Sequence, residues 1–199
     1  PGKTPAQWKV VIGRRFRTSA EAEDALISGR VDVTPQIGRA LARKLEQGTA
    51  IRVLRPRSDS VFFLQPNILP GARGMAWWPD GTPIDANPLA DVRVRRALSL
   101  AIDRDFLVSQ ALLGGGEVLA SPVPSDFFAA DPTLYPDPYH PALARHLLYS
   151  AGYPDGLTLA VAAMEDVESD GRQLLRALTV QFATVGIRLK PTYGSLRDF

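Results

Sequence analysis

The last part of the chain holds the pattern that most restricts its fold: two short apolar segments separated by one long amphipathic segment. Residues 157–164 read LTLAVAAM and residues 187–193 read IRLKPTY, and both have the length and composition of strands. Residues 169–185 between them carry one apolar helical side, made of Leu175, Leu178, Phe182 and Val185. A strand, a helix and a strand over this length predict a right-handed parallel βαβ unit, because the crossover helix packs back onto the sheet in that hand.

Strand and helix patterns also alternate in the first third of the chain. Segments rich in β-branched residues predict strands at residues 8–16, 30–37, 50–56 and 60–67. Capping residues and a terminal glycine bound two helices, at residues 18–29 and 38–48. Alternation of this kind predicts an α/β layer structure.

A run with several arginines, residues 87–116, hides an apolar stripe. Positions i, i+3, i+4, i+7 and i+8 predict one buried helical side, made of Val94, Ala97, Leu98, Ala101 and Ile102. Asp91 is placed to cap this helix and Asp103 to cap a second one that runs to Gly114. The arginines at 93, 95 and 96 point elsewhere, and two interpretations stay open for them. They form a solvated helix face, or they contact a phosphate or acidic ligand.

A later helix and an irregular connector complete the pattern. Residues 141–152 begin with proline, end with glycine and place apolar side chains on one side: Leu143, Leu147, Leu148 and Ala151. Residues 66–88 are rich in proline and glycine and lack a sustained period, which predicts a long loop. The Trp77–Trp78 pair in this loop either covers the edge of the core or contacts a ligand or partner.

Several kinds of chemistry have no residues to carry them. The chain has no cysteine, and its two histidines, His140 and His146, are six residues apart, which does not place both on one helical face. The glycines at 114–116 lack the spacing of a phosphate-binding loop, and no nucleophile elbow is present. We therefore expect no metal, no cofactor and no catalysis, which argues against a hydrolase or a transferase. A net charge of +2 argues against a nucleic-acid partner, and no apolar run predicts a membrane span.

Five segments, in order, resemble one bacterial family. They are EDALISGRVDVTP, PLADVRVRRALSLAIDRDFLVSQALLGGG, SPVPSDFFAADP, HPALARHLLYSAGYPDGLTL and LTVQFATVGIRLKP. Together they resemble the large solute-binding proteins of bacterial peptide, opine and nickel ABC importers, the extracellular solute-binding proteins of family 5. The resemblance implies an α/β fold of the periplasmic binding protein-like type II, with a mixed sheet, flanking helices and partial lobes.

The resemblance also implies a division of the chain. Residues 1–66 are expected to form the end segment of the first lobe up to the interlobe crossover, and residues 67–89 a Pro/Gly-rich connector. Residues 90–199 then begin the second lobe. Members of the family are much longer, so the chain is expected to be a central portion. It departs from them in a longer segment at 68–85 and in His140, which replaces an aspartate and is expected to weaken a helix cap.

The function implied by the resemblance is transport rather than catalysis. A periplasmic, extracytoplasmic protein of this kind captures a small solute, with a peptide as the first expectation, in an interlobe cleft and delivers it to the membrane permease of an ABC transporter. The side chains expected to line the cleft are Phe63, Gln65, Asn67, Thr34 and Trp77. For Phe63 a place in the core, and for Asn67 the capping of a turn, stay open. The alternative function is a sensory or protein-interaction domain that reuses the same scaffold.

Overall fold

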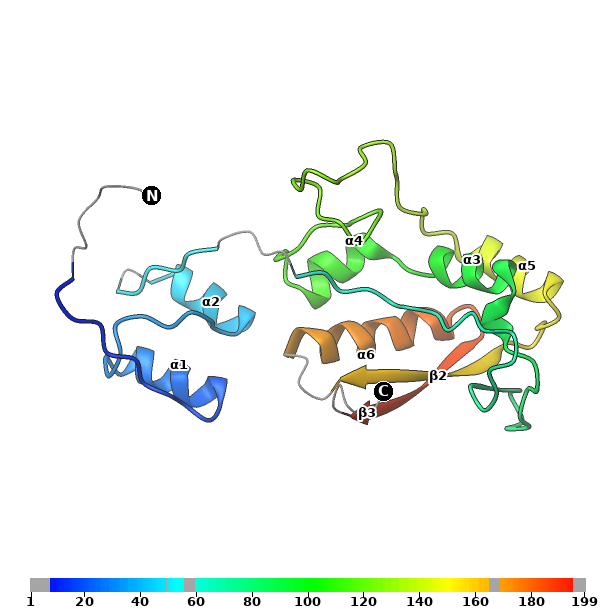
Figure 1. The fold of residues 1–199 in the computed structure, drawn as a ribbon, viewed down its shortest axis with the longest axis horizontal. Coiled ribbons are helices and arrows are strands. Elements are labelled where there is room, and N and C mark those ends of the chain that lie inside the picture. Colours follow the sequence, from blue (N-terminus) through cyan, green and yellow to red (C-terminus); the bar gives the residue numbers. More distant parts are fainter. Residues whose placement is uncertain (1–7, 49, 56–59, 165–168, 195–199) are drawn as a thin grey trace. The chain divides into compact units, whose positions relative to one another are not determined.

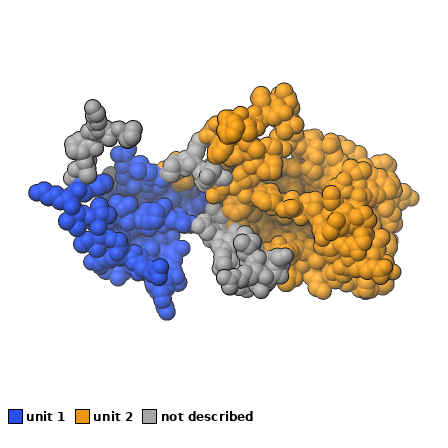
Figure 2. All heavy atoms as spheres, in the orientation of Figure 1, with its two compact units in different colours: residues 1–54 blue, residues 55–199 orange. Residues whose placement is uncertain are grey.

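The computed structural model describes residues 8–48, 50–55, 60–164 and 169–194. The chain divides into two compact units, residues 1–54 and residues 55–199 (Figure 2). Within the described residues, the first unit contains helices alone and the second contains helices and a sheet.

The first unit is built on two helices, α1 (Ser19–Ile27) and α2 (Arg39–Glu46). The Glu21 amide donates to the Thr18 hydroxyl at 3.2 Å, so Thr18 caps α1 as expected. The amide of Gly38, the N-cap of α2, donates to the Glu23 carboxylate at 2.6 Å and so ties the two helices together. The sequence prediction of two helices here is confirmed.

The four strands expected before residue 68 are absent from the described residues. Residues 8–16, 30–37, 50–55 and 60–67 have neither helical nor strand structure. Large apolar side chains remain exposed in the first of them: Trp8, Val10, Val11 and Ile12. A strand requires a neighbour that takes up its backbone hydrogen bonds, and no described segment pairs with these. The strand prediction for these four segments is therefore wrong for this chain.

The second unit contains one sheet with the order β1-β2-β3 (Figure 1). β2 (Leu157–Met164) and β3 (Ile187–Gly194) are parallel over their whole length, and α6 (Ser169–Ala183) connects them. β1 (Ala76–Trp77) pairs antiparallel with the start of β2. The predicted parallel strand–helix–strand unit and the mixed sheet are both confirmed.

Two glycines lie against each other where the parallel strands begin. Gly156 and Gly186 both have positive φ, +84° and +89°. A Cβ atom on Gly156 would lie 1.9 Å from the Gly186 carbonyl oxygen, and the Leu157 amide donates to that same oxygen at 3.1 Å. The close approach therefore sets the register at which β2 and β3 start.

The remaining helices of the second unit lie in the sequence between β1 and β2. They are η1 (Pro88–Ala90), α3 (Val92–Leu100), α4 (Arg104–Phe106), η2 (Leu107–Ala111) and α5 (Pro141–Ser150). The single helix expected from Asp103 to Gly114 is instead one α-helical turn followed by a π-helix that ends at Ala111. Here the Leu112 amide donates to the Leu107 carbonyl, five residues earlier, instead of to the carbonyl four residues earlier as in an α-helix.

The core forms where the apolar sides of α3, α5 and α6 meet the sheet. All four side chains predicted for the side of the crossover helix are buried: Leu175, Leu178, Phe182 and Val185. On α3 and just after it, Val94, Ala97 and Ala101 are buried, and Leu98 and Ile102 pack against the core. On α5 the prediction fails for Leu143, which is exposed, because Ala144 and Leu148 are the residues that face α3 in the core.

Candidate ligand-binding site

Residues 61–66 form an extended segment whose backbone has no hydrogen-bond partner among the described residues. Figure 1 shows this part of the chain as a teal trace outside any helix or strand. Phe62, Phe63 and Leu64 are exposed, at 48%, 65% and 46%, so successive side chains on both faces reach solvent. The segment therefore presents backbone donors and acceptors, unpaired within the described part of the chain, together with apolar side chains.

The end of the segment is held by a buried asparagine. The Asn87 side chain is 5% exposed, and its Nδ2 donates to the carbonyls of Asn67 (2.7 Å) and Leu69 (3.0 Å). The Leu69 amide donates to Oδ1 of Asn67 at 3.0 Å, so this side chain caps a turn. Sequence reasoning missed Asn87, although an Asn–Pro pair before a helix is a recognisable capping signal.

The five predicted site residues come from three segments of the chain, one in the first unit and two in the second. Phe63, Gln65 and Asn67 share one segment of the second unit, and Phe63 is exposed rather than in the core. Trp77 lies in β1, where it pairs with Thr158 at the amino end of β2. Thr34 belongs to the first unit, and its hydroxyl donates to the Gln36 carbonyl at 3.1 Å.

The Trp77–Trp78 pair makes contacts on the sheet side of the loop. The Lys190 ammonium of β3 lies 4.4 Å from the ring centre of Trp77, within the range of a cation–π interaction. The Trp78 ring lies 5.5 Å from the Tyr153 ring, in a tilted arrangement. Burial raises the pKa of the Tyr153 phenol above its usual value. Trp78 contacts the edge of the core through Tyr153, which packs against the core, but its own side chain is 36% exposed. Trp77 is half-buried, and its described ring contact is with the exposed Lys190.

The carboxyl end of the sheet carries a second aromatic and cationic pair. Tyr193 lies near the end of β3, and the Arg172 guanidinium of α6 lies 5.5 Å from its ring centre. Ligands of open α/β sheets bind beyond the carboxyl ends of the parallel strands. Sequence reasoning did not select Tyr193 or Arg172, because the two meet only when α6 folds back beside β3.

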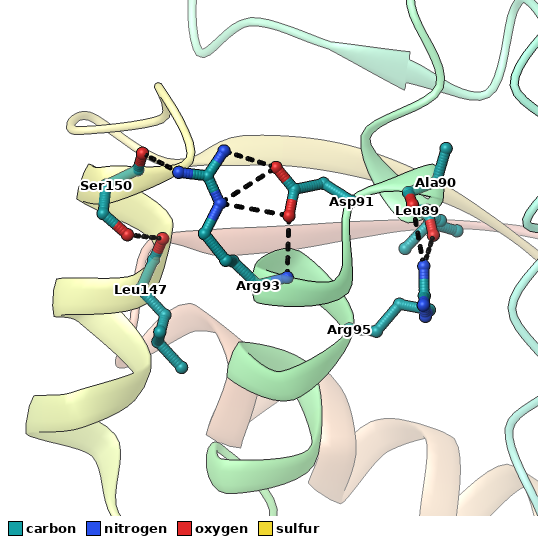
Figure 3. Close-up of polar contacts among 7 residues, drawn as sticks. All are labelled: Leu89, Ala90, Asp91, Arg93, Arg95, Leu147 and Ser150. Atoms are coloured by element: carbon teal, nitrogen blue, oxygen red, sulfur yellow. Dashed lines mark hydrogen bonds and ion pairs between the residues drawn. The ribbon is translucent and has the colours of Figure 1, made fainter.

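In the arginine-bearing run of residues 87–116, Arg93 and Arg95 bind the chain's own backbone and a carboxylate (Figure 3). Arg93 donates to both oxygens of Asp91 and to the Ser150 carbonyl on α5, while Arg95 donates to the carbonyls of Leu89 and Ala90 at 2.9 Å. These contacts argue against a phosphate or acidic ligand at Arg93 and Arg95, because the guanidinium groups already bind the chain itself. They also show a role beyond a solvated face, since Arg93 connects α3 to α5.

The surroundings of Asp91 and Arg104, two residues of this run, shift the pKa values of their side chains. The Arg93 hydrogen bonds hold the pKa of the Asp91 carboxyl below its usual value. Arg104 is half-buried, and its guanidinium donates to the carbonyls of Ser99 and Asp137 at 3.1 Å. Burial lowers the Arg104 pKa, and the nearby Asp137 charge opposes that shift. Asp91 stabilises the start of α3, and Arg104 stabilises the corner between α3 and α4.

The histidine expected to weaken a cap acts as a cap. The Leu143 amide donates to Nδ1 of His140 at 3.2 Å, so the ring takes over the role of a carboxylate at the start of α5. Among the described residues, no three His, Cys, Asp or Glu side chains gather as a metal site would need. Within the same part of the chain, no helix is long and apolar enough to cross a bilayer.

The chain matches the bacterial extracellular solute-binding proteins, family 5, middle region, over residues 2–196. It is 27% identical over 155 residues to the di/tripeptide-binding protein 1 of Pseudomonas aeruginosa, covering 75% of this chain and 29% of that protein. It is 32% identical over 109 residues to the glutathione-binding protein GsiB of Pectobacterium atrosepticum, covering 55% of this chain and 21% of that protein. The chain thus spans about a third or less of the length of these relatives.

The fold also matches solved structures. The dipeptide-binding protein of Pseudoalteromonas sp. SM9913, in complex with Met-Leu, superposes with a TM-score of 0.66 at 20% identity, over 92% of this chain and 34% of that chain. At this identity the likeness concerns the fold. It confirms the type II periplasmic binding protein architecture, represented here in part.

Proposed function

The chain belongs to the bacterial extracellular solute-binding proteins, family 5, and from that membership we propose that it serves in capturing a small solute for an ABC importer. The solute is first of all a peptide, held in the cleft between the two lobes of such a protein and delivered to a membrane permease. The protein acts outside the cytoplasm, in the periplasm, and performs no catalysis.

The observation that carries the peptide proposal is the backbone of residues 61–66, which is unpaired among the described residues. An extended peptide adds to such a segment as a neighbouring strand does, through main-chain hydrogen bonds that are independent of its sequence. The exposed side chains of Phe63 and Gln65 then contact alternate peptide side chains. The names of two of the relatives, a di/tripeptide-binding protein and a glutathione-binding protein, support the same solute class.

The proposed mechanism is lobe closure around the solute. A solute that contacts both lobes favours the closed state by the difference between its affinities for the closed and the open protein. Residues 61–67 form the crossover, with Asn67 as its fixed end because Asn87 holds the carbonyls of Asn67 and Leu69. Thr34 and Trp77 stay proposed contacts at the periphery of the cleft.

Proline substitution tests the main-chain contacts directly. Proline removes one backbone N–H but fits an extended conformation, and neighbouring residues of an extended segment point their N–H groups to opposite edges. Val61→Pro and Leu64→Pro, three residues apart, are therefore matched variants of opposite direction, and both keep the side chains of Phe63 and Gln65. The affinity for Ala-Ala-Ala is measured by isothermal titration calorimetry, with free alanine as the control solute.

We expect one of the two variants to lose about tenfold or more in affinity, because an unpaired polar group in a closed site costs about 1–3 kcal/mol. The other variant keeps the affinity of the unsubstituted protein. Equal affinities in all three proteins, with normal unfolding curves, would rule out pairing at this segment. Binding of free alanine as tight as that of Ala-Ala-Ala would rule out a peptide as the preferred solute.

A further inference from the structure

A groove outside the proposed solute site lies between η2 and the first half of α6, two elements that pack against each other. It has a volume of about 360 Å³. Its apolar lining comes from Phe106, Ala111, Leu113 and Ala177. The groove is shallow and open to solvent, so a ligand in it would keep part of its own surface exposed. None of the residues assigned above to solute binding lines it.

Among the described residues that line the groove, the polar side chains are two amides and one cation. Gln110 comes from η2, and Gln173 and Arg176 come from α6. Arg176 is the only charged side chain within that described lining, and none of the described acidic side chains pairs with it. Arg172, one turn earlier on α6, lies over the Tyr193 ring instead. The groove therefore offers a guanidinium that no described carboxylate occupies, beside an apolar surface.

The backbone at the end of the groove is strained. Leu113 has a φ of +51°, the left-handed region that a branched side chain enters at a cost, and Gly114 follows with a φ of +74°. A glycine at 113 would adopt this conformation freely, whereas the leucine side chain forms part of the lining. The groove also borders the π-helix of residues 107–111. Strained residues and π-helical turns cluster at functional sites.

We propose that this groove binds a small carboxylate with an apolar body, such as a short aliphatic acid. The apolar body packs on Phe106 and Leu113, and the carboxylate pairs with the Arg176 guanidinium, whose planar fork matches two carboxylate oxygens. The side-chain amides of Gln110 and Gln173 donate to the same oxygens. A strongly hydrated ion such as free phosphate does not suit a groove whose surface is mainly apolar.

Hexanoate is the probe for this site, titrated into ¹⁵N-labelled protein and followed by NMR. We expect saturable shifts of the side-chain amides of Gln110 and Gln173 with a Kd on the order of 1 mM, as suits a ligand with so few atoms. Acetate has the charge without the apolar body, and hexylamine has the body with the opposite charge. Both bind at least about tenfold more weakly if the proposal holds.

Substitutions of Arg176 and Leu113 measure separately what the charge and the apolar lining contribute to hexanoate binding. Arg176→Gln weakens hexanoate binding by about tenfold or more, and Arg172→Gln on the same helix changes it less than about twofold. Leu113→Gly weakens hexanoate binding while the unfolding free energy of the protein is unchanged or higher, because the glycine relieves the backbone strain.

Other results would overturn the proposal. They are an absence of saturable shifts with hexanoate, equal affinities for hexanoate and hexylamine, or an unchanged hexanoate affinity in Arg176→Gln. Displacement of hexanoate by Ala-Ala-Ala would likewise overturn it, because it would place the groove within the peptide site. A failure of Ala-Ala-Ala to bind at all leaves the hexanoate result standing, so the two proposals fail separately.

Discussion

Gly156→Ala is the substitution whose effect the structure determines most sharply. Alanine at this position adds a Cβ atom 1.9 Å from the Gly186 carbonyl oxygen, far inside any allowed contact. It also holds an L side chain at a φ of +84°. We expect a large loss of stability with two separable causes, one conformational and one steric.

Three glycines allow the two causes to be measured apart. Gly152 has a φ of +95°, and nothing lies within 4 Å of the place where its Cβ atom would be, so Gly152→Ala reports the conformational cost alone, about 1–2 kcal/mol. Gly156→Ala adds the collision, which separates the starts of β2 and β3 and breaks the bond from the Leu157 amide to Gly186. Leaving the amide of the buried Leu157 unpaired costs about 1–3 kcal/mol more. The expected total for Gly156→Ala is therefore about 2–5 kcal/mol.

Urea unfolding followed by tryptophan fluorescence measures these differences. The chain has three tryptophans, of which Trp8 lies in the first unit and Trp77 and Trp78 in the second. A Trp8→Phe background restricts the signal to the unit that contains these glycines. Linear extrapolation then gives the free energy of unfolding for each variant.

The comparison between variants decides the outcome. We expect Gly156→Ala to be the least stable, Gly152→Ala the most stable, and Gly186→Ala intermediate, because a Cβ there meets the Gly156 Cα at 3.3 Å. If Gly156→Ala and Gly152→Ala agree within about 0.5 kcal/mol, a typical error for such differences, the close approach of the two strands does not exist in solution.

Three further substitutions test the core, the start of α3 and the α3–α4 corner. Leu178→Ala truncates a buried side chain and should lower the free energy of unfolding by about 2–5 kcal/mol. Val180→Ala, at an exposed position of the same helix, should lower it by less than about 0.5 kcal/mol. Equal losses for the two variants in urea unfolding would mean that the wrong side of the helix is assigned to the core. Asp91→Ala should cost about 1 kcal/mol at pH 7 as a lost cap. The pKa of Asp91 is lower in the folded than in the unfolded protein, so its carboxylate stabilises the fold fully above the unfolded pKa of about 3.9. This stabilisation is lost as the pH falls through the folded pKa, so the destabilisation by Asp91→Ala should shrink in acid. A destabilisation that does not change with pH would contradict this. Arg104→Ala should cost about 1–3 kcal/mol, since the carbonyls of Ser99 and Asp137 lose a donor, and an unchanged thermal melting curve would show that water replaces the guanidinium.

The helices and the parallel strand pair can be predicted from the sequence because their signals are local. A helix forms its hydrogen bonds within itself, so the apolar period through Leu175, Leu178 and Phe182 already indicates which side is buried. The capping roles of Thr18, Asp91 and Asp103 are likewise readable, since each cap binds an amide two or three residues away. The family follows from the order of five such segments.

What the sequence does not determine depends on partners far along the chain. Residues 8–16 and 60–67 have the composition of strands, but a strand exists only where another segment accepts its hydrogen bonds, and composition does not supply one. The arginines of α3 have two interpretations on sequence alone, a solvated helix face or contact with a phosphate or acidic ligand. The Ser150 carbonyl, which binds Arg93 and so argues against the ligand, comes from a helix more than fifty residues away. The groove beside Arg176 lies where the π-helix η2 and the left-handed Leu113 meet α6, and this contact joins segments that are far apart in the sequence.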